Sequence, residues 1–484
     1  MLNPLYTIVA ILVVALSTGC AQHYPEVEPD FEQNWQSQTY QSQAYLIPTA
    51  GEAFARRVSL VRSAQQHIDI TYFSWDKDTS GLLLLEELRL AADRGVKVRL
   101  TLDDLLLFNE KWLAGLNQHP NIAIKVFNPF HSRKLGWIGR AVDFASHQRQ
   151  RDNRLHEKYF NIDGQWLILG GRNIGDAYFG FSQQANFFDM DTLFKGDIIR
   201  PFARNYDTLW HSEHLQDISS LIAHDHQQPL EEFEQAIKKH TNKAVIAHIE
   251  EQVEQVEQLS TIDFIDVKAT PVFDSLAKLN DNKPYFRTRA EHTIDQYLNK
   301  AKSALISTPY MVPSQGEFTV VDKLVANQAQ VTLLTNSSAS NDSGFIPAYY
   351  EQHRITLLNK GVDIFEYKAN ASNDDHFYHA DTYYHNKTLI LDSQLSYIGS
   401  SNFDPRSDFL NIEFGVFVDS TQFAQQVEHY LLRQQTVYWH VSLDEQGKPQ
   451  WQSADEIHHD NPDYGKWHEI PNWLFRKMHG EFEL

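Results

Sequence analysis

The chain has 484 residues, of which 42% are hydrophobic and 12% aromatic, and these values exclude a largely disordered protein. This length exceeds what one ordinary core needs, so two large domains or one duplicated domain are expected. The formal net charge of -21 argues against a nucleic-acid partner and against docking of the whole surface on an anionic bilayer, because both need clustered Lys and Arg.

The N-terminal stretch resembles a secretion signal that ends at the only cysteine of the chain. In "LYTIVAILVVALSTGC" an uncharged apolar run from Leu5 to Leu16 precedes small residues and Cys20. Such a run is short for a membrane span but fits the apolar part of a signal peptide. The ending "LSTGCA" resembles a bacterial lipobox, so residues 1–20 are predicted to be a lipoprotein-type signal peptide with lipidation at Cys20. The alternative is an uncleaved anchor with a chance cysteine.

This signal predicts a membrane-anchored bacterial lipoprotein that faces the periplasm. The residue after Cys20 is Ala rather than Asp, which favours the outer membrane if the bacterium is Gram-negative. A single cysteine also excludes an intrachain disulfide and a cysteine-based metal site.

Residues 21–44 are polar, rich in Gln and without periodicity, which predicts a flexible tether. A globular pattern begins near residue 45, where runs typical of strands alternate with an amphipathic helical pattern. The strands are expected at 66–75, 96–104 and 121–129, and the helix at 80–95. This alternation predicts a largely parallel sheet that is covered by helices.

The same order of elements returns in the second half of the chain. Strand-like runs at 303–312, 329–337 and 362–370 correspond to the three runs of the first half. A repeat of this length indicates a duplicated domain. We therefore expect a first domain at 45–225, a helical acidic connector at 226–280, a second domain at 281–440, and a C-terminal hairpin and tail at 441–484.

Two stretches, one in each half, carry the same polar residues at the same intervals. The first, "HEKYFNIDGQWLILGGRN", contains His156, Lys158, Asp163, Gly170, Gly171 and Asn173. The second, "HNKTLILDSQLSYIGSSN", contains at equal spacing His385, Lys387, Asp392, Gly399, Ser400 and Asn402. A single histidine on a strand is usually a surface or core residue, but two copies with identical spacing favour a functional site.

Each stretch predicts a β-hairpin that brings these residues together. Residues two apart on a strand share a face, so His156 and Lys158 are expected to point together. A two-residue turn at Asp163-Gly164 would set Gly171 opposite His156, where a small residue leaves room for a phosphate. Asn173 would follow, able to donate to phosphate oxygens. The corresponding residues of the second hairpin are His385, Lys387, Ser400 and Asn402.

Two His, two Lys and two Asn suit the transfer of a phosphodiester without a metal. Lysines and amide donors can stabilise the charge of the transition state on the non-bridging oxygens. One neutral imidazole can attack phosphorus, and the other can protonate the leaving alkoxide and then deprotonate the incoming alcohol or water. Each ring needs a carboxylate to orient it, and the candidates are Asp191 in "FFDMDTLF" and Glu413 in "FLNIEFGVF". Asp163 and Asp392 are expected mainly to hold the turns.

Both stretches match the pattern HxK(x)4D(x)6G[GS]xN, and on these residues the chain resembles the phospholipase D superfamily from Tyr45 to Trp439. The strings "LGGRNIGDAYF" and "IGSSNFDPRS" look most like bacterial cardiolipin synthases that use phosphatidylglycerol and a second phospholipid. The resemblance implies an α/β, duplicated phospholipase D-like fold with two mixed β-sheets flanked by helices around a shared central cleft.

The resemblance also implies site roles and substrates. The first histidine, His156, would be the nucleophile and His385 the general acid and base, although the two roles could be exchanged. By the convention of the superfamily, Asp163 and Asp392 are counted with the catalytic residues. The implied partners are the membrane and phospholipid substrates, phosphatidylglycerol and possibly phosphatidylethanolamine, with no cofactor, no metal and no nucleic acid.

Other features of the sequence offer competing interpretations. The basic stretch 130–154, with interleaved apolar residues, is either a lipid-facing lip beside the first motif or a solvated loop. Adjacent Asp103 and Asp104 could mimic a glycosidase pair, but neighbours on a strand point to opposite faces, so a strand-end role is expected. The His-rich segments "DDHFYHADTYYH" and "IHHD" lack further ligands at zinc-like spacing.

Four functions remain open at this point. The leading hypothesis is a phosphatidyltransferase that makes cardiolipin through a phosphohistidine intermediate. A phospholipase D that hydrolyses phospholipids to phosphatidic acid would use the same residues with water as the acceptor. A nuclease of the superfamily is disfavoured by the acidic charge, and an inactive lipid-binding scaffold by the two intact motifs.

Overall fold

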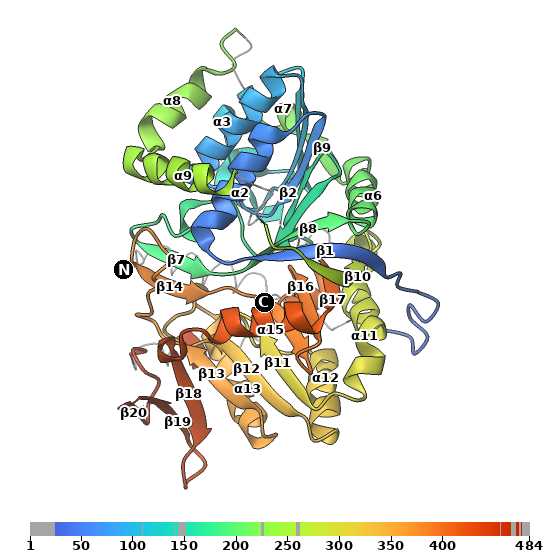
Figure 1. The fold of residues 1–484 in the computed structure, drawn as a ribbon, viewed down its shortest axis with the longest axis vertical. Helices are drawn as coiled ribbons and strands as arrows, with labels where there is room; N and C mark the ends of the chain where they lie inside the picture. The colour runs from blue at the N-terminus through green and yellow to red at the C-terminus, as the bar shows by residue number, and fades with distance from the viewer. Residues whose placement is uncertain are drawn as a thin grey trace.

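The computed structural model describes residues 25–484 except 109, 141, 144–151, 224–226, 258–261, 455, 466–470, 474–475 and 477–484. The predicted signal peptide and Cys20 therefore lie outside the described residues. Two similar α/β halves lie one above the other in Figure 1, with the N-terminal half in blue and green and the C-terminal half in yellow and red. No helix in these described ranges has the length and apolar character needed to span a membrane.

The first half contains a mixed sheet with helices on its faces. Its strands are β1 (Tyr40–Ile47), β2 (His67–Tyr72), β3 (Lys97–Asp103), β4 (Ile122–Phe127), β5 (Tyr159–Ile162), β6 (Trp166–Gly170), β7 (Ala185–Phe188), β8 (Asp191–Gly196) and β9 (Leu215–Asp217). Its helices are α2 (Ala50–Ser63), α3 (Thr79–Asp93), α4 (Lys111–Leu116), α6 (Ile199–Trp210), α7 (Ile218–Leu221), α8 (Glu231–His240) and α9 (Lys243–Val256), with 3-10 turns at Arg133–Leu135 and Asp176–Tyr178.

The second half repeats this arrangement. Its strands are β10 (Ile265–Phe273), β11 (Ser303–Ser307), β12 (Gln330–Asn336), β13 (Asp363–Tyr367), β14 (Asp381–Tyr384), β15 (Thr388–Leu391), β16 (Leu395–Gly399), β17 (Phe414–Asp419), β18 (Tyr438–Leu443), β19 (Pro449–Ser453) and β20 (Glu456–His458). Its helices are α10 (Lys278–Asp281), α11 (Tyr285–Leu298), α12 (Gln315–Ala326), α13 (Ile346–Asn359), α14 (Pro405–Phe409) and α15 (Thr421–Leu432), with a 3-10 turn at Gln435–Val437.

The strand order shows the duplication directly. In the first half the order is β4-β3-β2-β5-β6-β8-β1, and in the second it is β13-β12-β11-β15-β16-β17-β10. Within each half the first three strands are parallel, and the first strand of the hairpin, β5 or β15, is antiparallel to them. The duplication and the mixed sheets agree with what the resemblance implied, whereas the alternation of strands and helices alone predicted a largely parallel sheet.

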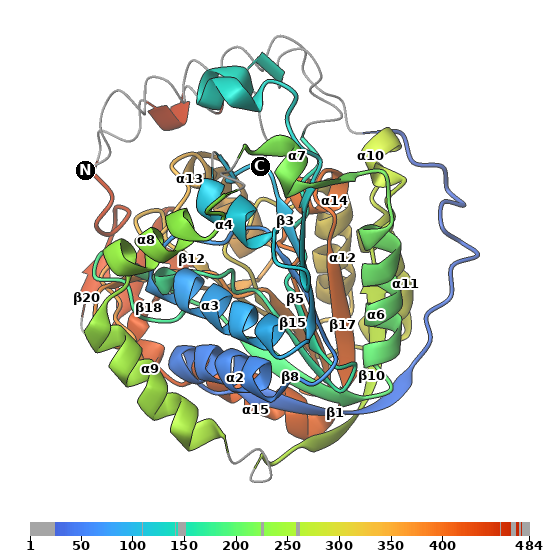
Figure 2. The same ribbon diagram turned by 90° about the horizontal axis from the view of Figure 1, so that it is seen from above.

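The two half-sheets are joined edge to edge by an antiparallel pairing of β1 with β10, from Tyr40 opposite Ala269 to Ala44 opposite Ile265. In Figure 2 helices α6 and α11 lie along one face of this junction, and α2 and α15 along the other. One hydrophobic cluster contains residues of both halves, among them Leu167 and Val416. Because the halves share a core and a sheet, the positions of the two motifs are fixed relative to one another.

The predicted tether and connector are corrected by this junction. Within the expected tether 21–44, Glu28 and Glu32 pair with Lys283 and Arg289, and strand β1 begins at residue 40. Within the expected connector 226–280, α8 and α9 are helical as predicted, but 265–273 is strand β10. Both strands were missed in the sequence because their buried and exposed side chains alternate, so that polar residues make up much of each segment.

Candidate active site

The backbone preceding each motif histidine pairs with the opposite half of the chain. The amide of His156 donates to the carbonyl of Ile412 at 3.0 Å, and the amide of Ile412 donates to the carbonyl of Arg154 at 2.8 Å. The same contact is repeated between the amide of His385 and the carbonyl of Phe188 at 2.8 Å, where β14 runs parallel to β7. The two motifs therefore meet at the junction between the halves.

Each imidazole is bound by a carboxylate from the other half. Nδ1 of His156 lies 2.9 Å from Oε1 of Glu413, and Nδ1 of His385 lies 2.6 Å from Oδ2 of Asp189. With Nδ1–H donating to the carboxylate, Nε2 is the nitrogen of each ring that is left for chemistry. The crossed pairs tie the orientation of one motif to the fold of the other half.

The prediction that Asp191 orients a histidine is wrong. Asp191 is buried beside two arginines, with its Oδ2 at 3.0 Å from Arg57 and 3.3 Å from Arg172. The strand register explains the error, because Gly170 lies opposite Asp191 whereas the equivalent Gly399 lies opposite Gly415. The residue two positions before Gly415 is Glu413, so its true equivalent is Asp189, two positions before Asp191.

The expected phosphate-binding role of Gly171 and Ser400 is also corrected. A side chain at Gly171 would overlap both carboxylate oxygens of Asp189. At the equivalent place, the hydroxyl of Ser400 donates to Oε2 of Glu413. The small residue of each motif thus accommodates the orienting carboxylate rather than the phosphate.

The predicted hairpins are present, but their register is shifted by one residue. Ile162 pairs with Trp166, which leaves a three-residue turn in which Asp163 and Gly164 have positive φ values of 54° and 64°. His156 and Lys158 precede β5 instead of lying on it, and His385 and Lys387 likewise precede β15. Both lysines nevertheless turn back to their histidines.

The two lysines are buried beside the histidines. Nζ of Lys158 donates to the carbonyl of His156 at 2.7 Å. Nζ of Lys387 contacts the carbonyl of His385 and lies 2.7 Å from its Nδ1. Lys158 and Lys387 are 2% and 3% exposed. Two buried ammonium groups are thus available in the site to bind the oxygens of an anionic substrate.

Burial sets the protonation of this site. It lowers the pKa of His156 to about 4 and of His385 to about 3, and the nearby lysine charges act in the same direction. Burial also lowers the pKa of Lys158 to about 7 and of Lys387 to about 8. The charge of Lys387 acts on His156 and that of Lys158 acts on His385, which shows that the motifs form one electrostatic unit.

Both orienting carboxylates are ionised in this environment. Although burial opposes ionisation, the contacts with His156 and Lys158 hold the pKa of Glu413 at about 2. For Asp189 burial is likewise outweighed, here by the charge of Lys387 and the hydrogen bond from His385, and its pKa is lowered. Neutral imidazoles that donate to fixed carboxylates are the form in which Nε2 can act as a nucleophile or a base.

Asp163 and Asp392 hold the hairpin turns, as their position in the sequence suggested. The carboxylate of Asp163 accepts hydrogen bonds from the amides of Gln65, Gln66 and His67, each at 2.8 Å. That of Asp392 accepts from Lys302 and Ser303 at 2.7 and 2.8 Å. These contacts secure the starts of β2 and β11. The superfamily convention that groups both with the catalytic residues is therefore not supported by their position.

The two asparagines have different partners. Nδ2 of Asn173 donates to the hydroxyl of Tyr178 at 3.0 Å, and its Oδ1 accepts from the amide of Ser74 at 3.3 Å. Oδ1 of Asn402 is buried and has no hydrogen-bond partner among the described residues. Both amides lie directly after the hairpins, where the prediction placed the phosphate-binding donors, but the unpartnered atom of Asn402 is an acceptor, so the phosphate-binding role of both residues stays a prediction.

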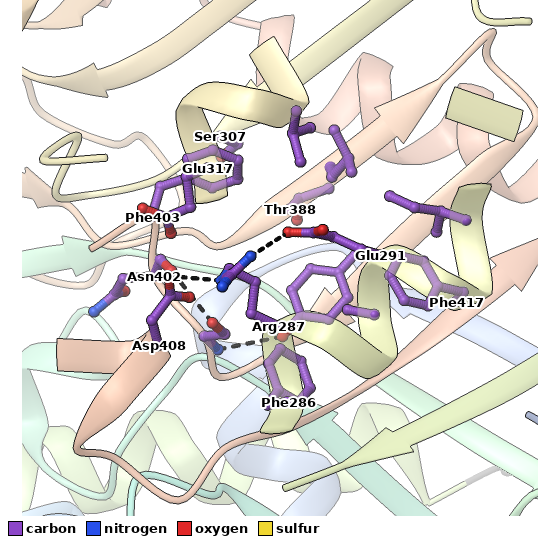
Figure 3. A pocket seen from close by; sticks show the side chains of 16 residues that line it. Phe286, Arg287, Glu291, Ser307, Glu317, Thr388, Asn402, Phe403, Asp408 and Phe417 are labelled. Atoms are coloured by element: carbon purple, nitrogen blue, oxygen red, sulfur yellow. Dashed lines mark hydrogen bonds and ion pairs between the residues drawn. The ribbon is translucent and has the colours of Figure 1, made fainter. Parts of the chain in front are cut away.

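A cavity of about 90 Å³ adjoins the second motif and is bordered by Asn402 and Thr388. Figure 3 shows Arg287 between Glu291 and Asp408 on its polar side, with Phe286 and Phe417 on the apolar side. The guanidinium of Arg287 pairs with Glu291 at 2.6 Å and with Asp408 at 3.0 Å. The cavity lies between α11, α12 and the sheet, so it extends the junction into the second half.

Sequence reasoning missed several residues that build the site. Oε1 of Glu413 accepts from the hydroxyl of Ser407 and from Nδ2 of Asn411, both at 3.2 Å. The rings of Tyr178 and Phe187 lie 5.5 and 5.2 Å from that of His385. The only sequence signal was their closeness to the motifs. In the described ranges no three His, Cys, Asp or Glu side chains gather as a group that could hold a metal ion.

Comparison with known proteins identifies relatives over most of the chain. A family model described as "Cardiolipin synthase, PLD-like domain" matches residues 58–210 and 294–434, once in each half. Cardiolipin synthase C of Escherichia coli K12 is 30% identical over 413 residues, which cover 83% of this chain and 86% of that protein. A cardiolipin synthase of Staphylococcus aureus Mu50 is 24% identical over 78% of this chain and 64% of its own length.

A solved structure shares the fold. The phosphatidylserine synthase of Haemophilus influenzae Rd KW20 aligns with a TM-score of 0.61 and 15% sequence identity, covering 92% of this chain and 97% of that one. At this identity the likeness concerns the fold alone.

Proposed function

This chain belongs to the phospholipase D-like, cardiolipin synthase family, and from that membership we propose that it is a phosphatidyltransferase that makes cardiolipin through a phosphohistidine intermediate. The donor would be phosphatidylglycerol or phosphatidylethanolamine, and the acceptor would be a hydroxyl of a second phosphatidylglycerol. The observation that carries the proposal is the pair of crossed carboxylate–histidine contacts, which leaves two Nε2 atoms available in one site beside two buried lysines.

In the first half-reaction Nε2 of His156 attacks the phosphorus of the donor. A P–N bond forms while the P–O bond to glycerol or ethanolamine breaks, and protonated His385 gives its proton to the leaving oxygen. The bound phosphodiester anion favours the imidazolium form of His385 that this step requires. Lys158 and Lys387 stabilise the negative charge on the non-bridging oxygens.

In the second half-reaction a hydroxyl of phosphatidylglycerol attacks the phosphatidyl-His156 intermediate. Neutral His385 removes the proton of this hydroxyl, a new P–O bond forms, and the P–N bond to His156 breaks. Cardiolipin leaves, and His385 is again protonated for the next donor. Splitting the transfer in this way needs only a single group that both gives and takes a proton.

The assignment of the two roles is supported by a difference between the rings. Nδ1 of His156 is held by Glu413, which accepts further hydrogen bonds from Ser400, Ser407 and Asn411. This network fixes one tautomer and suits a nucleophile. Nδ1 of His385 contacts Asp189 at 2.6 Å and Nζ of Lys387 at 2.7 Å, and it cannot donate to one and accept from the other at once. A ring with two competing partners suits proton exchange.

The predicted lipoprotein signal complements this chemistry. Lipidation at Cys20 would hold the enzyme at the membrane that contains its substrates, facing the periplasm, and in the outer membrane of a Gram-negative bacterium. The acidic charge of -21 is in accord with a lipid rather than a nucleic acid as the substrate.

The experiment that tests the proposal supplies purified full-length protein with labelled phosphatidylglycerol, alone and with phosphatidylethanolamine. We expect labelled cardiolipin and release of glycerol or ethanolamine. Phosphatidic acid as the sole product would identify a phospholipase D instead. Cleavage of a nucleic acid with no lipid turnover would identify a nuclease, and lipid binding without any turnover a scaffold.

A further inference from the structure

A group of large apolar side chains is exposed next to the first motif. Leu106, Leu135, Trp137, Ile138 and Val142 are 46%, 66%, 58%, 75% and 53% exposed, and we call them the apolar ridge. They are five of the eleven large hydrophobic side chains that are exposed in the described part of the chain. Isolated apolar residues are common on protein surfaces. A group that is confined to one loop and one short helical segment instead marks an interaction surface.

The polarity of this segment is inverted. Residues 136–140 and 142–143 are helical, and their exposed side chains include Trp137, Ile138 and Val142. The charged residues Arg140 and Asp143 are buried at 1% and 3% exposure. A helix on a water-facing surface shows the opposite pattern, with its charged face outside. The segment therefore exposes its apolar side chains and buries its charged ones.

Arg133 and Arg140, whose side chains are buried, connect the two parts of the ridge. Arg133 donates to the carbonyls of Leu107 and Phe108 at 2.8 and 3.0 Å. Arg140 donates to the carbonyl of Leu107 at 2.6 Å, and its guanidinium lies 3.9 Å from the centroid of the Phe108 ring. The rings of Phe108 and Trp137 lie 4.8 Å apart. The loop that carries Leu106 and the segment that carries Trp137 are thus one unit.

The ridge is connected to the catalytic histidine through two consecutive carboxylates at the end of β3. Asp104 pairs with Arg133 at 2.7 Å, on the ridge side. Asp103 accepts from the amide of Leu155 at 2.8 Å and pairs with Arg154 at 3.3 Å, directly before His156. Figure 2 shows this segment, in teal, at the periphery of the molecule on the side of α4 and α7.

We propose that the apolar ridge inserts into the interfacial region of a phospholipid bilayer and places the entrance of the active site against the membrane. This inference rests on the proposed function. A lipid bilayer is the partner of the ridge because the substrates of the proposed reaction are bilayer lipids. Five of the eleven exposed large hydrophobic side chains in the described residues belong to the ridge, which is connected to the residues before His156 through Asp104 and Asp103. Trp at such a position suits the boundary between headgroups and acyl chains.

The interaction is apolar rather than electrostatic. In the described part of the basic stretch 130–154, Arg133, Arg140 and Arg154 turn inward and bind within the protein, so these three side chains do not offer their charge to a lipid surface. Binding through the ridge is therefore expected to change less than about twofold between about 0.1 M and about 1 M salt, because screening acts on exposed charges.

The test uses full-length protein and vesicles of phosphatidylglycerol and phosphatidylcholine whose acyl chains carry bromine, a quencher of Trp fluorescence. We expect quenching that is lost in Trp137→Phe, which keeps the apolar surface and removes the reporter. Equal quenching in this variant would overturn the proposal. So would a concentration-dependent dimer in which Trp137 is shielded without vesicles, since a second copy would then cover the ridge. This readout requires no turnover, so it separates the ridge from the proposed reaction.

A kinetic comparison adds a matched control. Trp137→Ser with Ile138→Ser is expected to lower turnover of vesicle-borne phosphatidylglycerol about tenfold or more and to leave turnover of a monomeric short-chain analogue unchanged. The control, Ile457→Ser with Trp473→Ser, removes side chains of 55% and 57% exposure elsewhere and is expected to behave as wild type. Equal loss on both substrates, or the same loss in the control, would contradict the proposal.

Discussion

Asp189 of the N-terminal half binds His385 of the C-terminal half, with 2.6 Å between Oδ2 and Nδ1. Since Glu413 binds His156 in the reverse direction, each motif histidine receives its carboxylate from the other half. The duplication therefore produces one site rather than two, and the pairing of β1 with β10 joins the two halves that contribute to it.

We expect Asp189→Asn to lower kcat about 100-fold or more, because an amide cannot hold Nδ1–H of His385 and stabilise its protonated form. The folded structure should persist, because the amide keeps the volume of the carboxyl group and Lys387, whose pKa burial lowers to about 8, can release its proton when the carboxylate is removed. Phosphatidyl transfer and the thermal midpoint of the same preparation provide the measurement.

Asp191→Asn is the matched control for this variant. Loss of its charge leaves Arg57 and Arg172 buried without their carboxylate, so it should cost about 3–5 kcal/mol of stability. Full activity in Asp189→Asn, or loss of activity in Asp191→Asn without destabilisation, would restore Asp191 as the orienting residue.

Gly171→Ala should abolish transfer, because the new methyl group overlaps the carboxylate of Asp189 and displaces it from His385. Ser400→Ala is milder, since it removes one of four hydrogen-bond donors to Glu413, and a loss of about tenfold or less is expected. Assays of kcat for both variants check the ranking, and the reverse order would show that the small residues serve the phosphate.

The pKa values predict opposite effects of pH on activity and stability. The ammonium groups of Lys158 and Lys387 have pKa values of about 7 and about 8, so kcat/KM should fall as pH rises through this range and their charge is lost. The unfolded chain keeps these protons up to about pH 10.4, so it binds more protons than the native chain in this window. The free energy of unfolding should therefore rise with pH where activity falls.

A pH profile of kcat/KM and urea unfolding at matched pH values measure the two trends. Lys158→Arg keeps a positive charge at every pH of the profile. The fall of its remaining kcat/KM should therefore begin at a higher pH than in the wild type. A profile that is flat to pH 10 would exclude the lysines as its cause.

Asp163→Ala and Asp392→Ala should destabilise the protein and leave kcat largely unchanged. Each removes a carboxylate that accepts amide hydrogen bonds at the start of β2 or β11, which corresponds to about 1–3 kcal/mol. Unfolding midpoints and kcat at a temperature where both variants are folded are the measurement. A large loss of kcat without destabilisation would support the superfamily convention.

The duplicated α/β fold and the histidines and lysines of the site could be predicted from the sequence because they depend on local pattern and spacing. What failed depends on non-local pairing. Asp189 and Asp191 are two residues apart, so the choice between them requires the register of β6 against β8, because a shift by two residues exchanges one carboxylate for the other. The hairpin register failed for the same reason, since a three-residue turn replaced the expected two-residue turn.

The buried arginines could not have been predicted from composition. In the sequence Arg133 and Arg140 look like exposed basic residues. In the structure Arg133 pairs with Asp104 and Arg140 donates to the carbonyl of Leu107, so both side chains point into the protein. Their partners lie on a loop more than twenty residues earlier, so only the folded chain shows that the segment turns its apolar side chains outward.

The roles of the two histidines can be separated with a donor whose leaving group needs no acid. Phosphatidyl-p-nitrophenol releases p-nitrophenolate without protonation, so His385→Ala should still form the phosphatidyl-His156 intermediate and give a burst of about one equivalent before turnover stalls. His156→Ala lacks the nucleophile and should give no burst with the same donor. Rapid-mixing absorbance and detection of an acid-labile, alkali-stable phosphoramidate on the protein measure both steps. A burst in His156→Ala and none in His385→Ala would reverse the assignment, because the ring held by Asp189 would then carry the phosphatidyl group and the one held by Glu413 would move the proton.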